Sequence, residues 1–419
     1  MSADLLSSIT AAREGVRRQD SDGSGPDWDL SLLISVFILI ALGLVMLYSA
    51  SAVMAAQRMG EHYVLLTGQL EKVILGVGAM LVVMQIDYRW YRRLIYPIVG
   101  VTILLLIIVI IPQIGVVHNG ARRWINLFGF GFQPAELAKL TAVMFLAYSI
   151  SKKGKRMGSF TIGFIPHLVM IGTMVGLLMM QPDFGTSVML ISVMMLLLFA
   201  SGAKISYLLL LTFGGAFAGY MAISGSEYRM QRIFAFLDPW SHRQDIGYQI
   251  SESLIAIGSA GLGGRGLGEG AGKLGYVPEL WNDFIATIIA EELGIVGILL
   301  VVALFGFLLY RGMKIALEAT DAFGMYLAFG ITAIFLLQAV MNLFVVTGML
   351  PTKGLTLPFV SFGGTSMIVG LISIGVLLNI SKRAPDYWEL GRESRRSRRE
   401  DRHWEKKRQK ILKRRGDLK

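Results

Sequence analysis

The sequence contains no cysteine, only five histidines and few charged residues. A chain without thiols cannot form disulfides, a thiolate nucleophile, an iron–sulfur cluster or a Cys-type zinc site, and five scattered histidines offer little to a His-based metal site. Charged residues make up 16% of the chain, whereas a soluble globular protein carries about 25%. Any chemistry therefore rests on carboxylates, on Lys and Arg, and on the backbone.

The chain instead contains many long apolar segments. Hydrophobic residues make up 54% of its 419 residues, and the mean hydropathy of +0.59 excludes both a soluble and a disordered protein. A membrane-spanning helix needs about 20 mainly apolar residues. Ten windows suit such helices: 30–50, 73–87, 95–112, 134–151, 163–180, 186–202, 204–223, 284–310, 322–347 and 358–380. We predict an all-α integral membrane protein with ten transmembrane helices and a large extracytoplasmic loop, at about 224–283, between helices 7 and 8.

The net charge of +11 belongs mostly to one end of the chain. Residues 382–419 hold 16 of the 40 Lys and Arg residues but only 7 of the 29 Asp and Glu residues. Such a tail after an apolar span fixes topology and touches anionic lipid, and it does not predict nucleic-acid binding. Lys and Arg in the short connections place both termini in the cytoplasm. We predict a cytoplasmic extension (1–29), a ten-helix membrane domain (30–382) and a basic cytoplasmic tail (383–419).

A glycine run in the predicted outer loop contains a pattern that is found in nucleotide-binding proteins. Gly261-x-Gly263-x-x-Gly266 matches a dinucleotide fingerprint, but it lacks the preceding strand and the βαβ unit that such a site needs. No P-loop is present either. The glycines are better explained as residues that let a loop pack closely against the membrane or a ligand.

Several cations are predicted to lie near the outer ends of the helices. Pro134 suits the first position of a helix, which places Glu136 and Lys139 on one face, one turn inside. Two interpretations stay open: an intrahelical ion pair, or an anion site in which Lys139 joins Arg122 and Arg123. Further cations on outer segments are Arg229, Arg232 and Lys353, each of which is equally suited to anchoring at the membrane interface.

Carboxylates on the same side are candidates for a general base. Such a base should lie on a rigid element beside a desolvated cavity. Asp283 fits best, because Trp281-Asn282-Asp283-Phe284 ends the loop and starts a helix, although Asp is also a common helix N-cap. Glu291 and Glu292 lie about two turns deeper, where pairing with Lys or backbone is expected rather than catalysis.

Six motifs occur in the order of one known family. They are Gly120-Ala121-Arg122-Arg123-Trp124-Ile125, Phe132-Gln133-Pro134-Ala135-Glu136-Leu137-Ala138-Lys139-Leu140, Gln181-Pro182-Asp183-Phe184-Gly185-Thr186, Tyr228-Arg229-x-x-Arg232, Gly247-Tyr248-Gln249, and Val277-Pro278-Glu279 through Asp283-Phe284-Ile285 with Ala290-Glu291-Glu292-Leu293-Gly294. On these motifs, residues 30–382 resemble the shape, elongation, division and sporulation (SEDS) family. The turn 348–364 is similar to the cell-division branch rather than the elongation branch, and a sporulation member remains an alternative.

The resemblance implies a peptidoglycan glycosyltransferase that polymerises lipid II at the outer face of the bacterial cytoplasmic (inner) membrane. It implies a class B penicillin-binding protein and other divisome membrane proteins as partners, a place at the division septum, and Asp283 as the catalytic residue. One difference is that Trp281 and Asn282 stand where the family often has His-Thr, and Ala286 where it usually has Phe. We expect these residues to bind substrate: Arg122, Arg123, Trp124, Gln133, Glu136, Lys139, Asp183, Arg229, Arg232, Lys353 and Ser361.

The expected reaction joins two sugars with inversion. Asp283 takes the proton of the acceptor's 4-hydroxyl, which attacks the anomeric carbon of the donor, while the basic residues hold the departing pyrophosphate. No cofactor is certain; a divalent cation (Mg or Mn) is an optional assistant, and no spacing of metal ligands is present. Two alternatives remain. A lipid II flippase predicts polar residues that continue toward the cytoplasmic half, and a noncatalytic divisome scaffold predicts that Asp283→Ala leaves function intact.

Overall fold

The computed structural model describes residues 28–118, 120–127, 129–225, 227–244, 247–270, 281–352 and 354–382. Within them the chain is mostly helical. The helices are α2 (Leu30–Met59), α3 (Val64–Gln85), α4 (Arg89–Ile108), α5 (Pro134–Lys153), α6 (Ile165–Met180), α7 (Phe184–Ala200), α8 (Ile205–Ser224), α9 (Glu227–Leu237), α10 (Tyr248–Ala260), α11 (Ile285–Glu318), α12 (Ala322–Val346) and α13 (Gly364–Lys382). A short 3-10 helix (Gly154–Gly158) and a π-helical turn (Phe160–Phe164) join α5 to α6.

Each of the ten predicted windows falls on one of these helices. By length and composition, seven helices in the described part of the chain can cross a membrane, among them α2, α3, α4, α11, α12 and α13. The helix α5 falls outside that set because it carries charges near both of its ends, whereas α7 and the apolar part of α8 are shorter. The chain is therefore a multi-pass membrane protein, and the count of ten spans stays a prediction.

The helices begin where side chains satisfy their first N–H groups. Asp29, Asp183 and Asp321 cap α2, α7 and α12, each accepting a hydrogen bond from a backbone N–H three residues on. The predicted start of the last helix at 358 is wrong. The backbone N–H groups of Val360 and Ser361 instead donate to the carbonyl of Leu357, so a tight turn precedes the start of α13.

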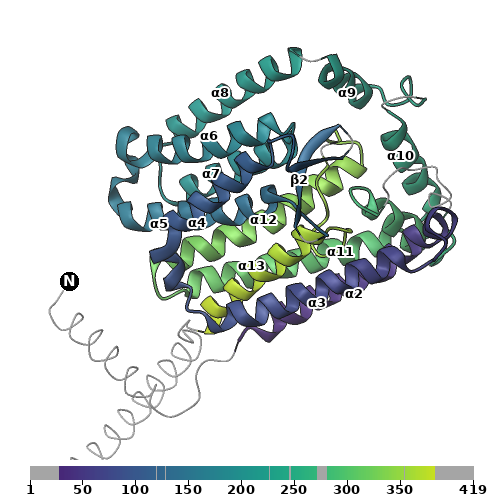
Figure 1. Cartoon of the computed structure of the whole chain (residues 1–419), viewed down its shortest axis with the longest axis horizontal. Coiled ribbons are helices and arrows are strands. Elements are labelled where there is room, and N and C mark those ends of the chain that lie inside the picture. Colours follow the sequence, from purple (N-terminus) through teal and green to yellow (C-terminus); the bar gives the residue numbers. More distant parts are fainter. Residues whose placement is uncertain are drawn as a thin grey trace, which may run out of the picture.

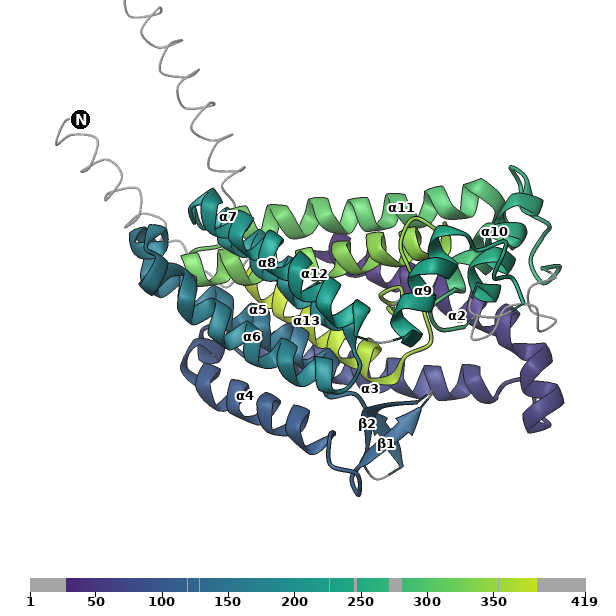
Figure 2. The same cartoon turned by 90° about the horizontal axis from the view of Figure 1, so that it is seen from above.

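The helices form one bundle with a few central members. α13 packs along α3, while α12 lies against α11, α5 and α7, and α11 lies against α2. Figures 1 and 2 show β2, α9 and α10 gathered toward one end of the bundle. Large apolar side chains remain exposed on the outside of the bundle, as on α8, where Phe213 and Phe217 are 71% and 66% exposed. Such a surface suits contact with lipid rather than water.

The prediction of a purely helical protein is wrong for the segment between α4 and α5. Strands β1 (Gly115–His118), β2 (Ala121–Leu127) and β3 (Phe130–Phe132) form an antiparallel sheet in that order. The pairing of β1 with β2 shifts between Val116 and Val117, which places one extra residue, Arg123, in β2. The Asn-Gly pair at 119–120, which follows Val116-Val117-His118, is a hairpin signal that hydropathy windows do not detect.

The long segment between α8 and α11 contains α9, α10 and the glycine run. Within this segment, α10 packs on α11. The glycine run meets a break in α11 at Gly294, whose φ is 65°. A Cβ added at Gly294 would lie 2.4 Å from the backbone N of Gly264 and from the carbonyl O of Leu262. The glycines thus allow a loop to pack directly on a helix, whereas the sequence predicts that the loop packs against the membrane or a ligand.

Candidate active site

Asp283 and Arg123 come together at Gly354. Asp283 is half-buried in the turn just before α11. A Cβ placed on Gly354 would lie 3.5 Å from Oδ2 of Asp283 and 3.9 Å from Nη1 of Arg123. Gly354 has a φ of +65°, which favours glycine. The bare backbone there leaves room for a carboxylate and a guanidinium from two distant segments to face one space.

The backbone of Asp283 is held from α12. The side-chain Nδ2 of Asn342 donates to the carbonyl of Asp283 at 2.8 Å and to the carbonyl of Leu355 at 2.6 Å. Phe362 N donates to the carbonyl of Trp281 at 2.8 Å. These bonds tie the turn that carries Asp283 to both ends of the 354–362 segment, so the carboxylate stands on a fixed backbone.

The two neighbouring arginines of β2 point to different partners. Arg123 donates from Nε to the carbonyl of Gln181 at 3.2 Å and from Nη2 to the carbonyl of Pro182. Arg122 donates to the carbonyl of Ile110 at 3.3 Å, and its buried Nε has no hydrogen-bond partner among the described residues. The two arginines point to different partners because of the bulge in β2, since an extra residue changes the direction of the side chains on either side of it.

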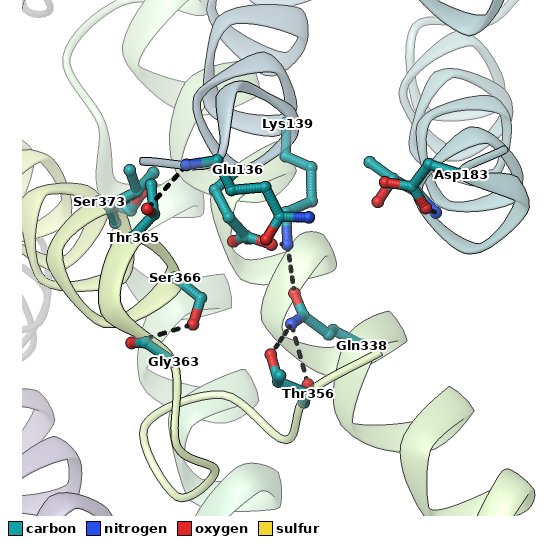
Figure 3. Close-up of polar contacts among 12 residues, drawn as sticks. Glu136, Lys139, Asp183, Gln338, Thr356, Gly363, Thr365, Ser366 and Ser373 are labelled. Carbon is teal, nitrogen blue, oxygen red and sulfur yellow. Dashed lines mark hydrogen bonds and ion pairs between the residues drawn. The ribbon is translucent and has the colours of Figure 1, made fainter. Parts of the chain in front are cut away.

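Lys139 belongs to a buried polar chain that reaches the same loop. Its Nζ lies 2.9 Å from Glu136 and donates to Oε1 of Gln338 at 2.9 Å. Gln338 in turn donates to the carbonyl of Thr356 at 2.9 Å, and Figure 3 shows these side chains pointing toward one another from α5, α12 and the loop. Lys139 is only 4% exposed. The intrahelical ion pair that the sequence left open is therefore present, whereas an anion site in which Lys139 joins Arg122 and Arg123 stays a prediction.

Asp183 caps the neighbouring helix. Its Oδ1 accepts from the backbone N–H of Thr186 at 3.2 Å, while Oδ2 is buried and accepts no hydrogen bond from any described residue. Figure 3 shows Asp183 on a separate helix from Lys139, outside the chain of contacts that is drawn. Arg123 links the two regions, because it binds the carbonyls just before Asp183.

Three other predicted residues lie around the same end of the bundle. The backbone N–H of Gln133 donates to Thr365 at 2.9 Å, joining the start of α5 to α13. Trp124 pairs with Val116 across the sheet. The hydroxyl of Ser361 accepts from the backbone N–H of Leu357 at 2.8 Å, so the structure assigns it a part in the turn before α13.

The structure describes the remaining predicted cations only in part. Arg229 and Arg232 both lie on α9 (Glu227–Leu237), which follows α8. Arg232 is half-buried, the side chain of Arg229 lies outside the described part, and so does the whole of Lys353. Their expected roles in binding substrate stay predictions.

Sequence reasoning missed Gln338 and Asn342. Both are buried on α12, at 4% and 1% exposure, and they stand four residues apart, so they share one face of the helix. Two amides at this spacing within an apolar helix are a signal in themselves, because buried polar groups in a membrane mark contacts or function. They are the residues that connect Lys139 and Asp283 to the loop.

The two deeper glutamates are paired, as expected. The carboxylate of Glu292 accepts from Ser49 Oγ at 2.6 Å and from Gly268 N at 3.0 Å. Glu291 lies 3.4 Å from Nη1 of Arg265. A guanidinium takes the place of the expected lysine, and the carboxylates hold the glycine run against the break in α11.

The described residues offer no set of ligands for a metal ion. Among the described residues, no three His, Cys, Asp or Glu side chains gather closely enough to hold a metal ion. The donors at Gly354 are one carboxylate and one guanidinium, and this set does not fit a resident cation. The arrangement is suited to removing a proton and to holding an anion.

A family model and several known proteins match most of this chain. The family model described as "Cell cycle protein", which covers FtsW, RodA and SpoVE, matches residues 30–385. The probable peptidoglycan glycosyltransferase FtsW of Geobacter metallireducens is 43% identical over 85% of this chain and 95% of its own length. Stage V sporulation protein E of Bacillus subtilis is 39% identical over 84% of this chain and 97% of its own.

Solved structures are also similar to this chain. A chain from a peptidoglycan synthase complex that coordinates polymerization and crosslinking has a TM-score of 0.73 at 29% identity, over 86% of this chain and 99% of its own. The rod shape determining protein RodA of Thermus thermophilus has a TM-score of 0.65 at 28% identity, over 85% and 97%. The resemblance that the motifs indicated is confirmed, and the chain belongs to the FtsW/RodA/SpoVE family of cell cycle proteins.

Proposed function

We propose that this chain is an inverting peptidoglycan glycosyltransferase that polymerises lipid II into β-1,4 glycan strands for septal cell-wall synthesis. The observation that carries the proposal is the meeting of the Asp283 carboxylate and the Arg123 guanidinium at Gly354. The relatives named as peptidoglycan glycosyltransferases support it, as does their match over most of the chain. Asp283 acts as the general base, and Arg123 with Lys139 supplies the positive charge.

The reaction moves one proton and exchanges one bond. The 4-hydroxyl of the acceptor N-acetylglucosamine loses its proton to Asp283 as its oxygen bonds to the anomeric carbon of the donor. The bond from that carbon to the pyrophosphate oxygen breaks, and the electron pair leaves with the undecaprenyl pyrophosphate. A cation placed where this charge develops stabilises the transition state. Arg123 is suited to that role because a guanidinium can contact two phosphate oxygens at once.

The other predicted residues take supporting roles. Asp183 and Gln133 stand at the starts of α7 and α5, where the helix dipoles favour an anion. Glu136 and Gln338 hold Lys139 in place. We assign the remaining expected contacts with the lipid-linked substrate to Arg122, Trp124, Arg229, Arg232 and Lys353. Ser361 is buried and supports the turn before α13 through its bond with Leu357.

The proposed topology has ten spans. Both termini then lie in the cytoplasm, and the 224–283 segment, with α9 and α10, forms the large outer loop between the seventh and eighth spans. The extension 1–29 and the basic tail 383–419 flank the membrane domain 30–382. Asp283 and Arg123 then face the outside, where lipid II is consumed.

We propose a class B penicillin-binding protein as the partner, with other divisome membrane proteins. The similar chain from a complex of polymerization and crosslinking supports a crosslinking partner. A divalent cation, Mg²⁺ or Mn²⁺, would have to be held mainly by the pyrophosphate, because the described donors do not form a set of ligands for it. No step of the reaction depends on it here.

Polymerisation of purified lipid II tests the proposal. The full chain is reconstituted with its cognate penicillin-binding protein, and glycan strands are measured for the wild type and for Asp283→Asn. Loss of a general base lowers the rate by about 100-fold or more, so the variant should make almost no glycan. Asn keeps the size of the side chain, and thermal unfolding in detergent together with co-purification of the partner shows whether the variant is intact.

The same preparation separates the alternatives. A flippase would move labelled lipid II across vesicle membranes without forming glycan, and Asp283→Asn would change that movement little. A scaffold would bind its partner and produce no glycan in either form. Glycan formed equally by the wild type and an intact Asp283→Asn variant would reject the proposed role of Asp283.

A further inference from the structure

A second cationic site lies at the opposite end of the bundle from Asp283. A cavity of about 600 Å³ is lined by Arg89, Arg92, Arg93, Tyr148, Lys152 and Asp321. It lies where α4 begins and α5 ends, whereas the sheet that carries Arg123 lies where α4 ends and α5 begins. Helices of 20 residues separate the two ends by about 30 Å. The cavity is therefore no part of the proposed active site.

The charges in this cavity are poorly balanced by the protein. Four cations face one carboxylate, and Asp321 is already engaged: it caps α12 through Gly324 N at 2.8 Å and accepts from Tyr88 at 3.1 Å. Arg89 approaches it only to 4.0 Å. In the described part of the chain, no carboxylate lies within ion-pair distance of the other three cations. An anion from outside is the natural counter-charge.

Aromatic rings hold two of these cations in place. The guanidinium of Arg93 lies over Trp90, 5.1 Å from the ring centre. Nζ of Lys152 lies 3.3 Å from the hydroxyl of Tyr148 and 5.6 Å from its ring centre. Rings position a cation without neutralising it. The positive charge thus stays available to a ligand.

The cavity adjoins a face that suits lipid. Trp90, Leu94 and Tyr96 on α4 are 53%, 47% and 61% exposed, and Val101 and Leu104 continue the exposed apolar face along the helix at 53% and 55%. Trp and Tyr favour the headgroup level of a bilayer, with apolar residues beyond them in the hydrocarbon. A ligand with a phosphate in the cavity and acyl chains along α4 matches both surfaces.

We propose that this cavity binds the headgroup of an anionic phospholipid from the bilayer. The guanidinium groups of Arg92 and Arg93 and the ammonium of Lys152 contact its phosphate, and the exposed face of α4 receives its acyl chains. A basic pocket between helices next to an interfacial aromatic belt is suited to such lipids. The site is separate from glycan synthesis and does not depend on the proposed reaction.

Lipid titration of the purified full chain in detergent tests this site. Short-chain phosphatidylglycerol is titrated, and bound lipid is counted by native mass spectrometry, with phosphatidylcholine of the same chain length as the neutral probe. The double variant Arg92→Gln/Lys152→Gln should bind phosphatidylglycerol about 25-fold more weakly, because each cation contributes about fivefold. Lys204→Gln is the matched control, since Lys204 is exposed and does not line the cavity.

Other outcomes overturn the proposal. Equal binding of phosphatidylcholine, or equal binding of phosphatidylglycerol by the double variant, would show that the cavity does not bind an anionic headgroup. Displacement by inorganic phosphate at the same concentration would make it a site for free anions, and preferential displacement by lipid II would make it a site for the lipid-linked pyrophosphate. If the double variant does not fold, as judged by gel filtration, Lys152→Gln alone replaces it, with an expected loss of about fivefold.

Discussion

Lys139 on α5 donates a hydrogen bond to Gln338 on α12 at 2.9 Å, two positions that are 199 residues apart. The same ammonium lies 2.9 Å from Glu136. This buried contact joins the helix that carries the Glu136–Lys139 pair to the loop beside Asp283, through the bond from Gln338 to Thr356. The ion pair of α5 is therefore part of the site's framework.

Breaking this pair from one side should cost more stability than removing it altogether. Lys139→Met leaves the Glu136 carboxylate buried without its cation, at a cost of roughly 3–5 kcal/mol, whereas the double variant Glu136→Gln/Lys139→Met leaves no uncompensated charge. We expect the single variant to unfold at a lower temperature in detergent than the double variant. Equal melting temperatures would contradict a buried, mutually dependent pair. Both variants should lose glycan synthesis, because both lack the cation.

Adding a methyl group at Gly354 should disturb the active site more than the fold. Gly354→Ala forces alanine into φ +65° and places its Cβ 3.5 Å from Asp283 Oδ2. Gly202→Ala is the matched control, since Gly202 has φ +77° and nothing within 4 Å of an added Cβ. Each should lose about 1–2 kcal/mol of stability, and only Gly354→Ala should lose polymerisation. Full activity of an intact Gly354→Ala variant would place the reaction elsewhere.

Asn342 should act by positioning Asp283. Asn342→Leu removes the donor that holds the carbonyls of Asp283 and Leu355, and a shift of about 1 Å in a reacting group can cost about 100-fold in rate. We expect kcat to fall while KM for lipid II changes little, in steady-state kinetics of glycan formation. Val340→Ala serves as the control, because Val340 on the same helix is 37% exposed. A rise in KM at constant kcat would instead indicate a role in binding.

Gly294 should be required for the packing of the glycine run. In Gly294→Ala the new Cβ meets backbone atoms of Leu262 and Gly264 at 2.4 Å, whereas Gly306→Ala on the same helix has nothing within 4 Å of its added Cβ. The first change should cost at least about 2 kcal/mol and open the loop to protease, because backbone must move. Gly306→Ala should melt like the wild type. Matching cleavage rates for the two variants would show that the loop does not depend on the break in α11.

The helices were largely predictable because their signals are local. Apolar windows of about 20 residues mark them wherever the chain crosses a bilayer, and Pro134 marks the start of α5. The sheet was missed because its strands are short and lie between apolar windows. The predicted start of α13 lies six residues too early. Residues 358–361 are apolar enough to join the hydropathy window, but they form a turn in which backbone N–H groups donate to the carbonyl of Leu357.

The candidate site was predictable in part. The motifs identified Asp283, Arg123 and Lys139. Neither spacing nor hydropathy could assign partners to Gln338 and Asn342, because the pattern along one helix does not indicate which neighbouring helix or loop it packs against. The sequence also could not show that Arg122 and Arg123 contact different partners, since this depends on a bulge in the pairing of β1 with β2.

By itself, the sequence determined that this chain is a many-helix membrane protein with a carboxylate and several cations near the helix ends, because composition and apolar length are properties of contiguous residues. Only the tertiary structure decided which of these charges share a space. Asp283, Arg123 and Gly354 meet across more than two hundred residues of chain. That meeting depends on helix packing and on a bare glycine backbone, which no local pattern encodes.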